Sequence, residues 1–123
     1  MNLSARADSL AKLITKELWS DEKNWFMTKD TSGIKYFSPS IQIFDLLRCG
    51  VLTETQEKKI LEHLNENEFL SEYGVHSLSK EDPGYDLNDA DWGGPGVYTG
   101  DAPELIEDLY YACLLYTSPS PRD

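Results

Sequence analysis

The chain has 123 residues, which is enough for one domain with a hydrophobic core and too few for two. Hydrophobic residues make up 40% of it, so its composition is not that of a disordered chain, and its apolar runs are too short to cross a bilayer. Its 11 Lys and Arg against 22 Asp and Glu give a net charge of −11, which repels phosphate backbones and anionic membranes. We therefore expect neither nucleic acid nor a membrane as a partner.

The first residues bear on the compartment. The stretch MNLSARADSLAKL lacks the charged, apolar and small-residue regions of a secretory signal. Two cysteines, Cys49 and Cys113, are too few for a disulfide scaffold and leave the redox compartment open. The localisation is unknown, and is cytoplasmic only if Met1 is the true start.

The first predicted element is an amphipathic helix from Ser4 to about Trp19, running on toward Phe26. Its apolar residues recur at helical spacing: Leu10, Leu13, Ile14 and Leu18. The stretch TKDTSGIKYFSPS that follows is rich in Thr, Ser, Gly and Lys, which predicts a loop.

Two shorter helices are predicted next. Pro39 stands where the first helical position needs no N–H, and Gly50 is placed to end this second helix. Thr53 and Gln56 have the spacing of a capping box at the start of a third helix. His63, near the end of that helix, is expected to face solvent.

The stretch from Phe69 to Gly100 breaks the helical pattern. It holds six of the eight glycines and no sustained period, but its large aromatic residues argue against disorder. A fourth helix is predicted after Asp101, with Pro103 in its first turn. No strand-like alternation is long enough for a sheet, so the predicted class is all-α with one long ordered loop.

The end of the chain, residues 113–123, reads CLLYTSPSPRD. This stretch resembles the translation of a sequencing-library adapter in one reading frame. The alternative is a natural tail rich in Pro and Ser. We therefore expect residues 1–112 to be the native domain and residues 113–123 to be a non-native, adapter-derived tail.

The long loop concentrates carboxylates beside aromatic rings. Its acidic residues, counted from Glu72 to the start of the fourth helix, are Glu72, Glu81, Asp82, Asp86, Asp89, Asp91 and Asp101. Glycoside hydrolysis uses such pairs, one carboxyl protonating the leaving oxygen and another activating water or attacking the sugar. Rings such as Trp92 and Tyr85 can cover apolar sugar faces, and carboxylates accept hydrogen bonds from hydroxyls. The competing interpretation is a solvated acidic surface.

Metal and phosphate sites are weaker interpretations of the same loop. Asp89 and Asp91 begin a calcium-loop pattern, but glycines replace two later ligands, so an irregular calcium site is the form left open. His63 and His76 are too few for zinc, and the GGPG stretch lacks the Lys and Ser/Thr of a phosphate loop. Those glycines can equally serve tight packing. We expect no metal and no cofactor.

Three stretches resemble the six-hairpin glycosidases, whose catalytic domains are (α/α)6 toroids. They are LWSDEKNWF, the stretch from SIQIFDLLRCGVL to FLSEYGVHSLSKEDPGYD, and DADWGGPGVYTGDAPELIEDLYYA. The family includes trehalases, processing alpha-glucosidases and mannosylglycerate-hydrolase-like enzymes. Its frequent W-R-G-P-x-W motif appears here as WGGPGV, with Gly93 in the place of Arg.

The resemblance implies that the chain is two helical hairpins from the latter part of such a toroid, and that the rest of the catalytic domain is its missing partner. It implies that the long loop lines a carbohydrate substrate. Asp91 is then the catalytic candidate. The substrate-binding candidates are Tyr73, His76, Ser77, Asp82, Tyr85, Asp89 and Trp92.

The predicted function is therefore that of a fragment of a glycoside hydrolase, inactive as an isolated chain. The alternative from another class is a non-catalytic helical interaction module with an acidic surface. A calcium-stabilised binding domain is a third possibility.

Overall fold

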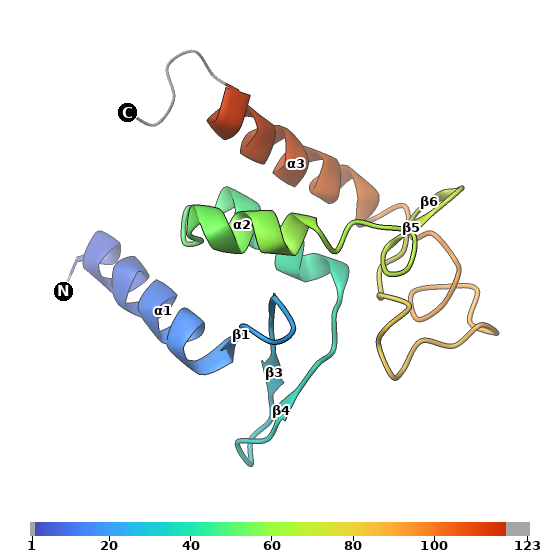
Figure 1. Ribbon diagram of the computed structural model, residues 1–123, viewed down its shortest axis with the longest axis horizontal. Coiled ribbons are helices and arrows are strands. Elements are labelled where there is room, and N and C mark those ends of the chain that lie inside the picture. The colour runs from blue at the N-terminus through green and yellow to red at the C-terminus, as the bar shows by residue number, and fades with distance from the viewer. Residues whose placement is uncertain (1, 118–123) are drawn as a thin grey trace.

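The computed structural model describes residues 2–117, with side chains described as far as Ala112. These residues form four helices and three two-stranded antiparallel sheets (Figure 1). The helices are α1 (Leu3–Leu18), the 3-10 helix η1 (Ile41–Arg48), α2 (Glu54–Leu61) and α3 (Ala102–Thr117). The strands are β1 (Trp19–Ser20), β2 (Trp25–Phe26), β3 (Thr28–Lys29), β4 (Lys35–Tyr36), β5 (Leu70–Ser71) and β6 (Gly74–Val75). The prediction of an all-α fold, two helical hairpins of a toroid, is wrong, because the described residues form a mixed fold with three β-hairpins.

The first hairpin replaces the predicted extension of α1. Strands β1 and β2 pair Trp19 with Phe26 and Ser20 with Trp25. The turn between them places Asn24 at a φ of 54°, a conformation that Asn tolerates better than most residues. The rings of Trp19 and Phe26 pack edge to face with centroids 4.9 Å apart. This aromatic contact across the two strands favours the hairpin over a continued helix.

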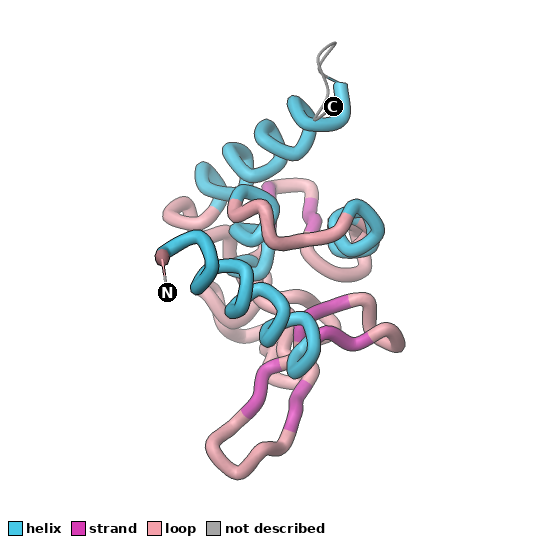
Figure 2. The backbone as a smooth tube through the Cα atoms, turned by 90° about the vertical axis from the view of Figure 1, so that its left-hand side faces the viewer, coloured by secondary structure: helices cyan, strands magenta, loops and turns pink. Residues whose placement is uncertain are grey.

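The second hairpin lies in the stretch predicted to be a loop. Strands β3 and β4 are joined by a turn in which Asp30 Oδ1 accepts hydrogen bonds from the Ser32 and Ile34 backbone N–H groups at 2.9 and 3.0 Å. Gly33 adopts a φ of 91° there. This hairpin projects from the end of the molecule opposite α3 (Figure 2).

The predicted start of α2 is confirmed, whereas η1 begins at Ile41, two residues after Pro39. Pro39 precedes η1, and Gly50 follows it with a φ of 70°. The capping box of α2 is complete: Gln56 N donates to Thr53 Oγ1 at 3.1 Å and Thr53 N donates to Gln56 Oε1 at 3.0 Å. Local hydrogen bonding therefore sets where α2 begins.

The third hairpin and the long loop are tied to the segment before η1. Strands β5 and β6 pair Leu70 with Val75. Just beyond them, Ile41 N donates to Ser77 O at 2.8 Å, and Ser79 N donates to Pro39 O at 3.0 Å. These backbone hydrogen bonds hold residues 77–79 of the loop against the segment that leads into η1.

The core is built around Trp25, whose side chain has no exposed surface. The rings of Phe44 and Phe69 lie 5.5 and 5.7 Å from it, centroid to centroid. His63 also packs against it, at 4.7 Å. The expectation that His63 faces solvent is therefore wrong, because its ring is held between this indole and a carboxylate. The remaining core residues are Phe26, Ile41, Leu47, Ile60 and Leu105.

The two longest helices differ in how they are packed. α3 lies against η1 through Leu105, whereas α1 contains no buried residue. No described helix is long and apolar enough to cross a membrane. α3 continues as helix past Ala112, but the side chains of the predicted adapter-derived tail lie outside the described residues, so that boundary stays a prediction.

Candidate functional site

The long loop is ordered by aspartates that bind their own backbone. Gly84 N donates to Asp82 Oδ1 at 2.7 Å, and two further turns repeat the pattern at Asp86 and Asp89, each 2.9 Å from the N–H two residues on. Such turns replace regular secondary structure as the source of backbone order. Three of the loop carboxylates are therefore engaged in holding its shape.

The glycines of GGPG are required by close packing of the loop on itself. A Cβ at Gly94 would lie 2.1 Å from Asp89 O, and one at Gly96 would lie 1.9 Å from Ala90 O. At Gly93 it would lie 2.7 Å from Asp89 Oδ2. The structure thus gives these glycines a packing role, and no side chain fits at these positions without moving the loop.

The His76 side chain contacts the backbone of this glycine stretch. Its ring is buried, and Nδ1 lies 3.2 Å from Gly94 O, a carbonyl that can only accept, so the ring proton is on Nδ1. Burial lowers the pKa of His76, with the Lys80 charge adding to this effect and the Gly94 bond opposing it. Its Nε2 is buried without a hydrogen-bond partner among the described residues.

Tyr85 lies beside His76, with ring centroids 5.8 Å apart and an edge-on geometry. Burial raises the pKa of the Tyr85 hydroxyl. The two rings therefore form a neutral, partly apolar patch within an otherwise acidic loop.

Asp101 joins the loop to α3. Its Oδ2 accepts hydrogen bonds from Ser77 Oγ at 2.7 Å and from Trp92 Nε1 at 3.2 Å. Ser77 is fully buried, whereas Trp92 and Asp101 are half-buried. One carboxylate oxygen of Asp101 thus links the Trp92 indole to the buried Ser77 hydroxyl.

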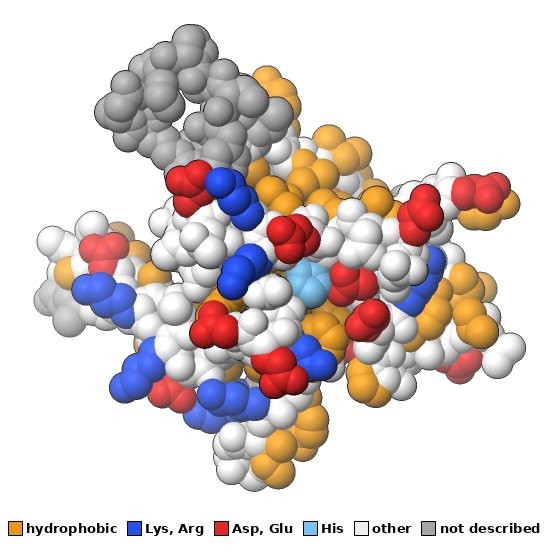
Figure 3. All heavy atoms as spheres, in the orientation of Figure 1, with side chains coloured by type: hydrophobic (Ala, Val, Ile, Leu, Met, Phe, Trp, Pro, Cys, Tyr) orange, Lys and Arg blue, Asp and Glu red, His pale blue; other side chains and the backbone are white. Residues whose placement is uncertain are grey.

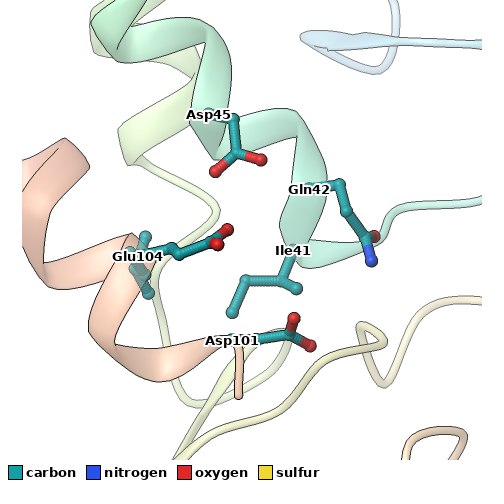
Figure 4. Close-up of a pocket in the computed structure, with 6 residues that line it drawn as sticks. Ile41, Gln42, Asp45, Asp101 and Glu104 are labelled. Carbon is teal, nitrogen blue, oxygen red and sulfur yellow. The ribbon is translucent and has the colours of Figure 1, made fainter.

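The same aspartate lines a small cavity between η1 and α3 (Figure 4). The cavity measures about 10 Å³, room for about one water molecule. Carboxylates from both helices face it, and the lining residues are Ile41, Gln42, Asp45, Asp101, Glu104 and Leu105. The cavity is therefore lined by polar side chains from both η1 and the start of α3.

A buried carboxyl group, that of Asp108, neighbours Asp45 of the cavity lining. The Asp108 side chain has no exposed surface, and Arg48 Nε contacts its Oδ1. Burial raises the pKa of Asp108 to about 7, the neighbouring Asp45 carboxyl adds to the rise, and Arg48 opposes it. Arg48 also binds Glu107 at 2.9 Å. Asp108 therefore holds its proton more tightly than an ordinary aspartate does.

The sequence did not single out this second cluster. Asp45, Glu104 and Asp108 lie on helices, where acidic residues usually face water. The available signal was the spacing of Leu105 and Asp108, which are three residues apart and share one helix face. Only the packing of α3 on η1 reveals that this face is turned inward.

The predicted site residues do not all converge. His76 and Tyr85 form one pair, and Ser77 and Trp92 meet at Asp101. Asp82 accepts a hydrogen bond from Ser38 Oγ at 2.7 Å, and Asp89 caps its own turn. Asp91, the catalytic candidate, is exposed at the loop tip.

Tyr73 lies elsewhere, at the tip of the β5–β6 hairpin with 83% of its surface exposed. It lines a separate open groove together with Lys80, whose Nζ is held by the carbonyls of Glu66 and Leu70.

The described part of the chain contains no group of three or more His, Cys, Asp or Glu side chains arranged to hold an ion. Within the calcium-like stretch, Asp89 Oδ1 accepts a hydrogen bond from the Asp91 backbone N–H.

Comparison with known proteins places the loop up to residue 96 inside a recognised domain. The family model of the mannosylglycerate hydrolase MGH1-like glycoside hydrolase domain matches residues 1–96, more than half of this chain. No curated protein matches the chain. The matched range includes the GGPG stretch and Trp92, and it ends before Asp101 and α3.

Proposed function

The chain belongs to the MGH1-like glycoside hydrolase domain family, and from this membership we propose that it supplies a substrate-lining loop to a catalytic domain that hydrolyses glycosidic bonds. In this chemistry a carboxylic acid protonates the leaving oxygen, and a carboxylate activates water or attacks the sugar. The family match over residues 1–96 is the observation that carries the proposal.

The geometry of the loop supports a role in binding sugar. Trp92 is half-buried, held at its indole nitrogen by Asp101, and no other aromatic ring is recorded against it among the described residues. Such a ring can cover the apolar face of a sugar while nearby carboxylates accept its hydroxyl hydrogens. The loop thus offers the contacts that a hydroxyl-rich ligand needs.

Asp91 is the proposed catalytic carboxylate. It is exposed beside Trp92, where a substrate on that ring could reach it. The other loop aspartates are poorer candidates, because Asp82, Asp86 and Asp89 hold backbone turns. The buried Asp108 cannot touch a substrate in this structure.

The charge of the loop favours a neutral glycoside over an anionic one. Residues 81–112 contain no Lys, Arg or His. Arg48 is engaged with Glu107 and Asp108, and Lys80 with two carbonyls. The carboxylate of a mannosylglycerate would therefore need a cation from outside this region, whereas the mannosyl group would not.

We also propose that the chain works as part of a larger catalytic domain. α1 buries no residue, and Leu10 and Leu13 are more than half exposed. Ile106 and Tyr110 are similarly exposed on α3, where Figure 3 shows apolar side chains gathered. Such helix faces are normally covered, and the rest of the domain is the proposed cover.

The sugar-binding part of the proposal is tested by saturation-transfer NMR on the chain with methyl α-mannoside and with α-mannosylglycerate. We expect magnetisation transfer to the neutral mannoside, weakened by Trp92→Ala and unchanged by Tyr110→Ala, which removes an exposed ring from α3. Absence of transfer, or equal transfer in the Trp92 variant, would count against a substrate-lining loop.

A non-catalytic interaction module is the second candidate function, favoured by the unburied face of α1. It predicts cooperative thermal unfolding of the isolated chain and no sugar binding. The saturation-transfer experiment therefore separates the two candidates.

A further inference from the structure

Trp92 is held to the molecule by one side-chain hydrogen bond. Its Nε1 donates to Asp101 Oδ2 at 3.2 Å, across nine residues of loop. The turns that order this part of the loop act on the backbone, at Asp86 and Asp89. The orientation of the indole ring therefore depends on where the Asp101 carboxylate is held.

Asp101 is itself fixed by a rigid neighbour. The same Oδ2 accepts the Ser77 hydroxyl at 2.7 Å, the shorter of its two bonds. Ser77 has no exposed surface, and its carbonyl accepts Ile41 N at 2.8 Å where η1 begins. Hydrogen bonds of Ser77 thus connect Asp101 to Ile41, a residue of the hydrophobic core.

The carboxylate is also placed by the start of α3. Asp101 directly precedes Ala102, and Leu105 N donates to Asp101 O at 3.2 Å in the first turn. Figure 4 shows Asp101 at this end of α3, below Ile41 of η1. Two elements that pack on each other, η1 through Ser77 and α3 through its first turn, therefore help to set its position.

We propose that Asp101 is a positioning residue, which holds the Trp92 indole in the orientation that the loop presents to a sugar. The inference rests on the proposed function, because it takes Trp92 as a substrate-contacting residue. Asp101 acts through Trp92 and need not touch the sugar. The hydrogen bond keeps the ring ordered before binding, so that less conformational entropy is lost when the sugar binds.

The acceptor can be kept while the charge is removed. Both donors meet a single oxygen, so the amide oxygen of Asp101→Asn can accept both bonds, whereas Asp101→Ala offers no acceptor. Asn is also as favourable as Asp before a helix, so the start of α3 is preserved. Glu104→Ala is the matched control, since it removes a carboxylate from the same cavity that has no recorded bond to Trp92.

The test is the indole N–H signal of Trp92 in the full chain, assigned by its loss in Trp92→Phe. We expect Asp101→Ala to shift this signal toward that of an unbonded indole and to speed its solvent exchange. Asp101→Asn and Glu104→Ala should leave it near the wild-type position. An unchanged signal in Asp101→Ala would overturn the proposal, and so would an equal shift in Asp101→Asn.

The binding arm uses methyl α-mannoside as the probe. We expect Asp101→Ala to weaken binding about two- to tenfold, the size expected from releasing one ordered side chain, and Asp101→Asn to restore it. If Asp101→Ala does not fold, Ser77→Ala tests the same line of contacts and should give a smaller shift of the same signal. A wild-type chain that binds no sugar contradicts the proposed function, while the indole signal still decides whether Asp101 positions Trp92.

Discussion

Asp108 is the residue whose ionisation is most altered by folding. It sits between η1 and α3 with no exposed surface, and burial raises its pKa to about 7. An unfolded aspartate has a pKa near 3.9, so the folded chain holds this proton more tightly than the unfolded chain does. Its contribution to stability is therefore greatest at low pH and falls as the pH rises from about 4 to about 7.

We predict that Asp108→Asn removes this part of the pH dependence. The free energy of unfolding of the variant, relative to wild type, should rise by about 1 kcal/mol or more between pH 4.5 and pH 7.5. Urea denaturation at several pH values measures it, with Asp86→Asn, an exposed loop aspartate, as the control. A difference between Asp108→Asn and wild type that stays constant with pH would contradict this account.

His63 makes two hydrogen bonds to other segments of the chain. Its Nδ1 lies 2.5 Å from Glu68 Oε1, and its Nε2 lies 3.0 Å from Asn24 O. The residue thus ties the end of α2 to the turn of the first hairpin.

We predict that His63→Ala lowers the free energy of unfolding by about 2–3 kcal/mol, because it removes a charge-assisted hydrogen bond and a ring packed on Trp25. Thermal or urea unfolding measures the loss. Glu62→Ala, at the neighbouring exposed position, should change stability by less than about 0.5 kcal/mol. Similar losses in the two variants would show that His63 is not a structural tie.

At the scale of elements, the long loop depends on backbone contacts that glycine alone permits. A Cβ at position 96 would lie 1.9 Å from Ala90 O, a backbone atom that cannot move aside like a flexible side chain. We predict that Gly96→Ala destabilises the chain by about 1–3 kcal/mol, the usual cost of overpacking.

The accompanying change should be local to the loop. Hydrogen exchange should speed up at the N–H groups of residues 86–94, and Pro95→Ala, at the adjacent exposed position, serves as the control. Wild-type exchange in Gly96→Ala would mean that the loop packs differently from the structure.

The start of α2 could be predicted from sequence, whereas Pro39 predicts a start for η1 two residues too early and the hairpins could not be predicted. The capping box of Thr53 and Gln56 is a local hydrogen-bond pattern, and it is confirmed. Two-residue strands are too short to show alternation, so the hairpins are set by turns such as the one at Asn24 and by aromatic packing in the core. For the same reason the predicted helix runs on toward Phe26, where the structure instead turns back at Trp19.

The candidate site divides along similar lines. The loop could be located from its glycines and aromatic residues, and the packing alternative for GGPG is confirmed by close backbone contacts. The partners of each side chain could not be predicted, because Ser77, Trp92 and Asp101 meet only when the loop folds onto η1 and α3. The roles assigned to Asp91 and to the substrate-binding candidates stay predictions.

For the whole molecule, we expect substitutions on the exposed helix faces to change the free energy of unfolding less than substitutions in the core. Leu10 and Leu13 are exposed, so Leu10→Ser with Leu13→Ser should change the free energy of unfolding of this chain by no more than about 0.5 kcal/mol for each site. Ile60→Ala, within the core, should cost about 2–5 kcal/mol.

Urea denaturation of the isolated chain compares the three proteins. The leucine changes should become costly only where the rest of the domain covers α1. A large loss already in the isolated chain would mean that Leu10 and Leu13 pack on this chain, in conflict with their exposure in the structure.

The decisive experiment measures glycoside hydrolysis by the chain extended into its flanking gene sequence, with mannosylglycerate and a panel of aryl glycosides as substrates. We predict hydrolysis by the extended protein, a loss of about a hundredfold or more in Asp91→Asn because the proposed acid–base carboxylate is removed, and no hydrolysis by the 123-residue chain alone. Hydrolysis by the isolated chain would contradict the claim that it is one part of a catalytic domain. An extended protein that folds and cleaves none of these glycosides would contradict the proposed activity itself.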